Sequence, residues 1–174
     1  MKITFGLDFD ITKEVLVYGL FEDDPEIDFN KELLKEYEYV LEKKIFFPTF
    51  GEVYSTRVIS LPFQKVFLIG LGKRGEMTLE RVRRVLGKSV KLVKGAMLES
   101  FTTNIICVVS GFGLYSDELL GQATAEGLLL GNYSFTHYLS AEKQLKKKII
   151  SSVAVQLKES SDAFEDGLKR GYLL

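Results

Sequence analysis

The stretch Val66-Phe67-Leu68-Ile69-Gly70-Leu71-Gly72-Lys73, followed by the segment 78–97, decides the fold class of this chain. Its first part is a short apolar run that ends in glycines, as a buried strand does before a turn. The following segment begins at Thr78, a residue type that caps helices, and repeats apolar side chains at three- and four-residue spacing. We therefore predict a strand, a turn and an amphipathic helix in succession.

The alternation of strands and helices extends along the whole chain. β-Branched, aromatic and apolar runs predict strands at 2–7, 14–21, 51–60, 64–71, 103–110 and 147–157. Apolar periodicity and capping residues predict helices at 31–42, 78–97, 116–130 and 161–174. The helix from Ser116 is apolar nearly all round, so we expect it to be deeply buried. This order predicts a single α/β domain over 1–174, a three-layer sandwich with a mixed, mostly parallel sheet.

The composition is that of an ordinary soluble globular protein. Hydrophobic residues make up 46% and charged residues 27% of the 174 positions, and 23 Lys and Arg nearly balance 24 Asp and Glu. This balance gives no overall electrostatic case for nucleic acid or an acidic membrane. The single Cys107 excludes an intrachain disulfide and fits a reducing compartment. With no signal-peptide core at the N-terminus, we expect a cytoplasmic protein.

Two glycine-bearing loops are candidate ligand sites. Gly70 to Gly75 match the dinucleotide pattern G-x-G-x-x-G, whose glycines let a backbone approach a pyrophosphate. However, the helix starts late, at Thr78, and the next predicted strand ends without the acidic residue that holds a ribose. The turn at 110–114 could cradle a phosphate, as such loops do in ADP-ribose-binding macrodomains, but the asparagine and longer glycine run expected near the first helix of such modules are missing. We predict that both loops are turns without a ligand.

The charged and titratable candidates are isolated. Arg81, Arg84, Lys88 and Lys91 form a basic helix face, which indicates a solvated surface or an acidic partner, with nucleic acid as the alternative. Residues 146–148, all lysine, are interpreted as a charged lead-in to a strand. The only histidine, His137, has no second histidine or thiolate to form a metal site or triad, so a structural role is expected.

Three further residue types have structural interpretations. Cys107, in the middle of a predicted strand, is expected to be a buried, inert thiol. The carboxylate of Glu126, within an apolar helix, should be paired with a backbone donor or with a Lys or Arg. Gly127 and Gly131 lie four residues apart on one face of that helix, where they would let another element approach closely.

These blocks together carry a resemblance. Residues 66–73, the amphipathic helix after them, and Ala125-Glu126-Gly127-Leu128-Leu129-Leu130-Gly131-Asn132-Tyr133-Ser134-Phe135 closely resemble the N-terminal domain of the leucyl aminopeptidase (cytosol aminopeptidase) family. The closing stretch 163–171 resembles the helix that leads into the catalytic domain of that family. The resemblance covers essentially the whole chain, although it is loose before residue 60.

The resemblance implies a macrodomain-like fold and a parent protein that is a cytoplasmic, usually hexameric, two-metal aminopeptidase. Its zinc or manganese ions and its catalytic residues would belong to the C-terminal domain, partly in an Asn-Thr-Asp-Ala-Glu-Gly-Arg motif. That motif is absent here, so no catalytic, cofactor-binding or metal-binding residue is assigned to this chain. We expect an accessory and oligomerisation domain, inactive alone, whose partners are its catalytic domain and other subunits.

Two alternatives remain open at this point. One is a free-standing module that binds ADP-ribose or a nucleotide through the loops at 70–75 and 110–114. The other is nucleic-acid binding by the basic face between Arg81 and Lys91. The apolar residues at the chain end, Leu168, Tyr172, Leu173 and Leu174, lead us to expect either that this turn docks onto the domain's own core or that another domain follows.

Overall fold

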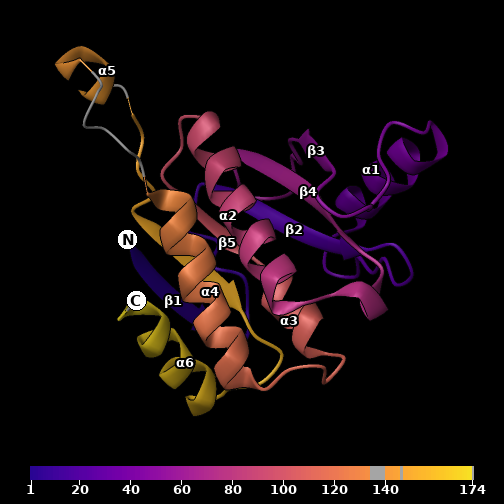
Figure 1. The fold of residues 1–174 in the computed structure, drawn as a ribbon. Coiled ribbons are helices and arrows are strands. Elements are labelled where there is room, and N and C mark those ends of the chain that lie inside the picture. Colours follow the sequence, from indigo (N-terminus) through magenta and orange to yellow (C-terminus); the bar gives the residue numbers. More distant parts are fainter. Residues whose placement is uncertain (134–139, 146, 174) are drawn as a thin grey trace.

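A computed structural model describes residues 1–133, 140–145 and 147–173 and shows one six-stranded sheet with helices on its faces (Figure 1). The strand order is β1-β6-β5-β2-β4-β3. Every neighbouring pair is parallel except β3 with β4. The predicted mixed, mostly parallel α/β sheet is therefore confirmed. The strands are β1 (Lys2–Gly6), β2 (Val15–Phe21), β3 (Val53–Thr56), β4 (Lys65–Gly72), β5 (Ser100–Thr103) and β6 (Ser152–Gln156).

The four predicted helices are present in order, and three shorter helical segments are added to them. The main ones are α1 (Lys31–Glu42), α2 (Leu79–Gly95), α3 (Ile105–Ser110), α4 (Asp117–Asn132) and α6 (Asp162–Tyr172), with a short η1 (Arg74–Glu76) and α5 (Ala141–Leu145). The predicted caps are confirmed, because the side chains of Thr78 and Ser116 accept hydrogen bonds from the backbone N–H groups of Arg81 and Leu119.

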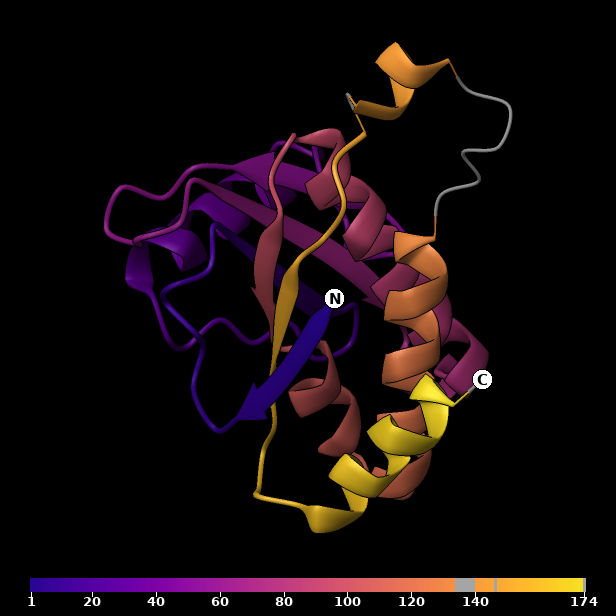
Figure 2. The ribbon, with the colours of Figure 1, turned by 90° about the vertical axis from the view of Figure 1, so that its left-hand side faces the viewer.

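Two cores lie on opposite faces of the sheet. Along β2 the side chains alternate, so that Val15, Val17 and Phe21 belong to one core, and Leu16, Tyr18 and Leu20 belong to the other. The larger core lies beneath α2, α4 and α6, and the smaller one beneath α1. In Figure 2, α4 and α6 lie together on one side of the strands. These are the three layers that the order of elements predicted.

The predicted strand at 103–110 is wrong. The strand in this region is β5, which ends at Thr103, and residues 105–110 form α3. Ile105, Ile106 and Val109 are all buried in the larger core. A short apolar run has the same hydrophobicity whether it is a buried strand or a buried helix, so periodicity alone could not separate the two. Cys107 therefore lies on a helix rather than in a strand.

Glycines bring α2, α4 and α6 into backbone contact. A Cβ atom placed on Gly127 of α4 would lie 2.7 Å from the carbonyl oxygen of Arg83 on α2. On the other side of α4, a Cβ on Gly121 would lie 2.2 Å from the carbonyl oxygen of Phe164, and one on Gly167 of α6 would lie 2.0 Å from that of Glu118. All three distances are too short for any side chain. The predicted close approach at Gly127 and Gly131 is thus confirmed, and the approaching element is α2.

Gly127→Ala tests this packing. The new methyl group meets the backbone of α2 rather than a flexible side chain, so the two helices must separate. We expect a loss of about 1–3 kcal/mol in the free energy of unfolding, measured by urea denaturation. Gly95→Ala is the matched control, because a Cβ there meets nothing within 4 Å, and it should be neutral or slightly stabilising. Equal effects of the two substitutions would contradict the packing account.

Candidate functional site

The glycine loop at 70–75 uses its backbone N–H groups within the domain. The N–H groups of Gly70 and Gly72 donate to the carbonyl oxygens of Glu52 and Pro48, at 2.8 and 3.0 Å. Gly72 has a φ of +74°, and a Cβ on Gly70 would lie 1.9 Å from the carbonyl oxygen of Thr49. The glycines therefore let the segment before β3 cross the end of β4. The N–H groups of Gly70 and Gly72 are therefore already hydrogen-bonded within the domain and are not free to bind a phosphate.

An open cleft lies at the carboxyl ends of the parallel strands, the usual ligand position in such sheets. It has a volume of about 460 Å³ and extends from the end of β2 to the turn at Gly111 and Phe112. This turn follows α3 and not, as predicted, a strand. The charged residues of the cleft are three carboxylates and one amine, from Asp24, Glu26, Asp28 and Lys158. Its lining therefore favours a cation over a phosphate.

Cys107 lies in the wall of this cleft and is half-buried. Burial raises the pKa of the Cys107 thiol, an effect that nearby Lys158 opposes and Asp28 reinforces. A raised pKa leaves little thiolate at neutral pH, which is the reactive form. The residue is thus less buried than predicted, but its environment is that of an unreactive thiol.

Two asparagines that the sequence did not single out hold separate segments of the backbone together. Asn104, which is buried, accepts from the N–H of Gly19 at 2.7 Å and donates to the carbonyl oxygen of the same residue at 3.2 Å. Asn132 makes the same pair of bonds with Ile150, at 2.9 and 3.1 Å. Each side-chain amide thereby replaces a backbone partner, one at the end of β5 and one at the end of α4.

Glu126 has the structural partner that its position predicted. Its carboxylate forms an ion pair with Arg83 of α2 and accepts a hydrogen bond of 2.8 Å from Gln122. Burial alone would raise the pKa of Glu126, but the hydrogen bonds from Gln122 and Arg83 and the charge of Arg83 outweigh it and lower the pKa. The acid is therefore ionised at neutral pH and ties α4 to α2, next to the glycine contact.

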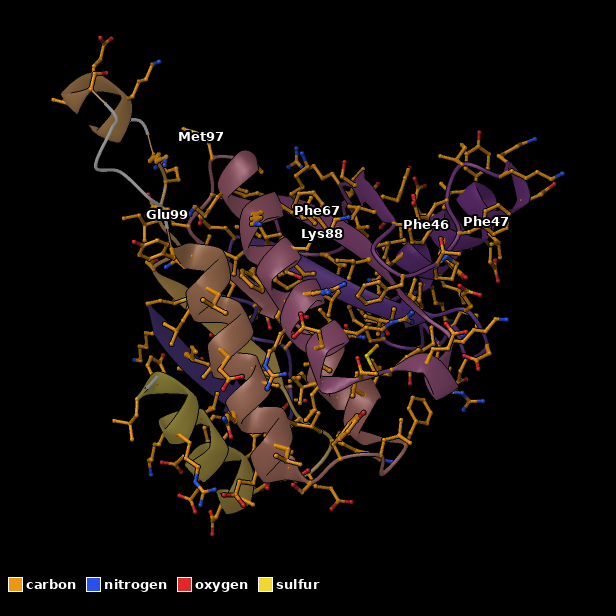
Figure 3. All side chains as sticks on the ribbon, in the orientation of Figure 1. Phe46, Phe47, Phe67, Lys88, Met97 and Glu99 are labelled. Carbon is orange, nitrogen blue, oxygen red and sulfur yellow. The ribbon has the colours of Figure 1, made fainter. Side chains whose placement is uncertain are left out.

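The basic face of α2 is partly neutralised within the domain. Arg84 pairs with Glu80 at 3.0 Å, and Arg81 pairs with Glu76 at 3.4 Å. Lys88, labelled in Figure 3, donates to the carbonyl oxygen of Gly51. Such pairs reduce the charge available to a polyanion, although Arg84, Lys88 and Lys91 are exposed.

The remaining candidates are His137 and the lysines at 146–148. His137 and Lys146 lie outside the described residues, and Lys148 pairs with Glu99 at 2.6 Å. Within the described ranges 1–133, 140–145 and 147–173, no group of three or more His, Cys, Asp or Glu is placed to hold a metal ion. Across the same part of the chain, no helix is long and apolar enough to cross a membrane.

The fold defines a macrodomain-like α/β class. A macrodomain from Oceanobacillus iheyensis solved with ADP superposes with a TM-score of 0.66 at 19% identity, covering 97% of this chain and 90% of that one. A mutant of tomato leucine aminopeptidase superposes with a TM-score of 0.73 at 18% identity, covering 99% of this chain but 35% of that one. At these identities the similarity establishes the fold alone.

The sequence itself establishes the family. Residues 17–142 match the model of the cytosol aminopeptidase family, N-terminal domain, and this chain belongs to that family. A probable cytosol aminopeptidase from Clostridium perfringens is 33% identical over 132 residues, which cover 75% of this chain and 26% of the relative. One from Clostridium tetani is 31% identical over 157 residues, covering 88% of this chain and 28% of the relative. The chain thus spans about a quarter of the length of these relatives.

Glu126→Gln tests the ion pair with Arg83 by its dependence on pH. Because folding lowers the pKa of Glu126 below its ordinary 4.5, the carboxylate adds stability above pH 4.5 that is lost as the pH falls through the lowered pKa. We expect Glu126→Gln to lower the free energy of unfolding by about 1 kcal/mol at pH 7. The difference should shrink below pH 4.5 and vanish well below the folded-state pKa.

The matched control is Glu165→Gln, which removes an exposed partner of Lys169 on α6 and should change stability little at either pH. If Glu126→Gln lowers the free energy of unfolding by the same amount across this pH range, the charge of Glu126 is not what stabilises the domain.

Proposed function

We propose that this chain is the N-terminal accessory and oligomerisation domain of a two-metal leucyl aminopeptidase that removes N-terminal residues from peptides. The observation that carries the proposal is the family match over residues 17–142, in a chain that spans about a quarter of its relatives' length. On this proposal, the zinc or manganese ions and the catalytic residues belong to the catalytic domain of the parent protein.

The proposal extends to assembly and location. In the parent protein the domain would help to hold subunits together, in a homohexamer, and would shape access of peptides to the catalytic domains. The name of the relatives, cytosol aminopeptidases, supports a cytoplasmic location. The domain itself would take no part in the bond-breaking step, in which metal ions activate water.

Hydrolysis of leucine p-nitroanilide tests this proposal. We expect the natural polypeptide that carries this sequence to cleave the substrate and to lose activity on chelation of divalent metal. The 174-residue chain alone should show no activity, with or without added zinc or manganese. Metal-dependent cleavage by the purified chain, or a natural polypeptide without peptidase activity, would contradict the proposal.

ADP-ribose binding is the second candidate function, favoured by the position of the cleft and by the macrodomain-like fold. The cleft is lined by the carboxylates of Glu26, Asp28 and Asp24, the last of which pairs with Arg74 at 3.3 Å, and this acidic lining disfavours a pyrophosphate. We therefore expect isothermal titration calorimetry to detect no saturable binding of ADP-ribose. Saturable binding that is lost in Gly111→Val would instead support a nucleotide-binding module.

A further inference from the structure

The outward side of α4 carries exposed apolar side chains at both ends, with the polar pair Gln122 and Glu126 between them. The sequence predicted a deeply buried helix, and the sides that meet the sheet, α2 and α6 are indeed buried. The outer face is not: the side chains of Leu119, Leu130 and Tyr133 are 44%, 72% and 71% exposed. A helix that is apolar round its whole circumference is normally covered on every side. The apolar side chains on this side of α4 therefore have no described element of the domain packed over them.

Two hollows flank Leu130 on this face. One, of about 420 Å³, lies between α2 and α4, where Gly87, Gly127 and Gly131 form part of its lining. The other, of about 440 Å³, lies between the ends of α4 and α6 and is lined by Leu129, Leu130, Tyr133 and Gly171 together with Arg83 and Glu126. Because Arg83 and Leu130 line both, the hollows form one continuous surface, which we call the outer helical face.

The outer helical face has a defined charge pattern. Arg84, Lys88 and Lys91 of α2 line the first hollow beside Leu130, and Glu80 is the one carboxylate there. The second hollow has a single ion pair, Arg83 with Glu126, surrounded by apolar side chains. A complementary partner presents apolar side chains at its centre and carboxylates toward α2.

The match to an N-terminal domain and the place of α6 beside this surface argue for one partner. The last turn of α6 borders the second hollow through Gly171. Tyr172, which ends α6, is 43% exposed and donates to the carbonyl oxygen of Met1 at 3.2 Å, whereas Leu173 is 88% exposed. The matched regions make up 26% and 28% of the relatives, which are about three times as long as this chain and hold further chain outside the match. We propose that the outer helical face is the docking surface for the catalytic domain of the same polypeptide. This inference rests on the proposed function.

Thiol labelling of Leu130→Cys tests the docking surface directly, in a Cys107→Ser background, with the modification measured by mass spectrometry on the peptide that contains residue 130. Ile59→Cys is the matched control, since Ile59 is 90% exposed and its N–H bonds to Glu32 of α1, in the opposite layer. In the 174-residue chain both thiols should react rapidly with a maleimide reagent. In the natural polypeptide, Leu130→Cys should react at least about tenfold more slowly, because a buried thiol reacts only on local opening, while Ile59→Cys is unchanged.

The outcomes separate the two proposals. A natural polypeptide that hydrolyses leucine p-nitroanilide but labels Leu130→Cys as fast as the 174-residue chain does would overturn the docking surface and leave the proposed function intact. A natural polypeptide without peptidase activity would overturn both. Protection of Leu130→Cys in the isolated chain, at concentrations where it sediments as a dimer, would assign the face to a second copy. Protection that disappears when an oligomer dissociates on dilution would assign it to a neighbouring subunit, and either result would contradict docking in the same polypeptide.

Discussion

Backbone contact between three helices is the constraint on which the rest of this domain depends. Glycines on both sides of α4 let it lie against α2 and α6 at distances that no side chain permits. The cost is that these contacts bury little apolar side-chain area, so the layer relies on the sheet beneath it for hydrophobic stabilisation. Leu120, Ala123 and Leu128 of α4 supply that contact in the larger core. Helix α4 therefore contacts α2, α6 and the sheet.

The same constraint determines where the domain can meet other molecules. With its flanks filled by helix backbone, α4 can offer only its outer side, and there Leu130 and Tyr133 remain exposed. The cleft at the carboxyl ends of the strands has a different character, since Asp24, Glu26 and Asp28 make its lining acidic. In this chain the macrodomain-like fold therefore combines an acidic cleft with a helical face that is basic along α2 and apolar at the end of α4. That combination suits a domain whose main partner is a protein rather than a phosphate-bearing ligand.

Much of the fold could be predicted from the sequence, because local signals and tertiary packing agree. The helix from Thr78, the cap at Ser116 and the partner of Glu126 follow from capping chemistry and from the cost of burying an unpaired carboxylate. The glycines of α4 indicated a close approach, although the sequence could not identify α2 as its neighbour. The apolar run at 103–110 misled the prediction, because buried strands and buried helices share the same composition.

The candidate sites were less predictable, because they depend on contacts between distant parts of the chain. Asn104 and Asn132 each replace a backbone partner for a residue far along the sequence, Gly19 and Ile150, and no local pattern marks such a role. The exposure of Leu130 was missed for a related reason: an apolar helix is expected to be buried, and a sequence does not say which molecule buries it.

An experimental structure of the natural polypeptide, with the exposed fractions of Leu130 and Tyr133 measured in it, tests the account most directly. The account predicts that both side chains, 72% and 71% exposed in this domain, are buried against the proposed catalytic domain. A catalytic domain that packs on the α1 side, with both side chains still exposed, would contradict it.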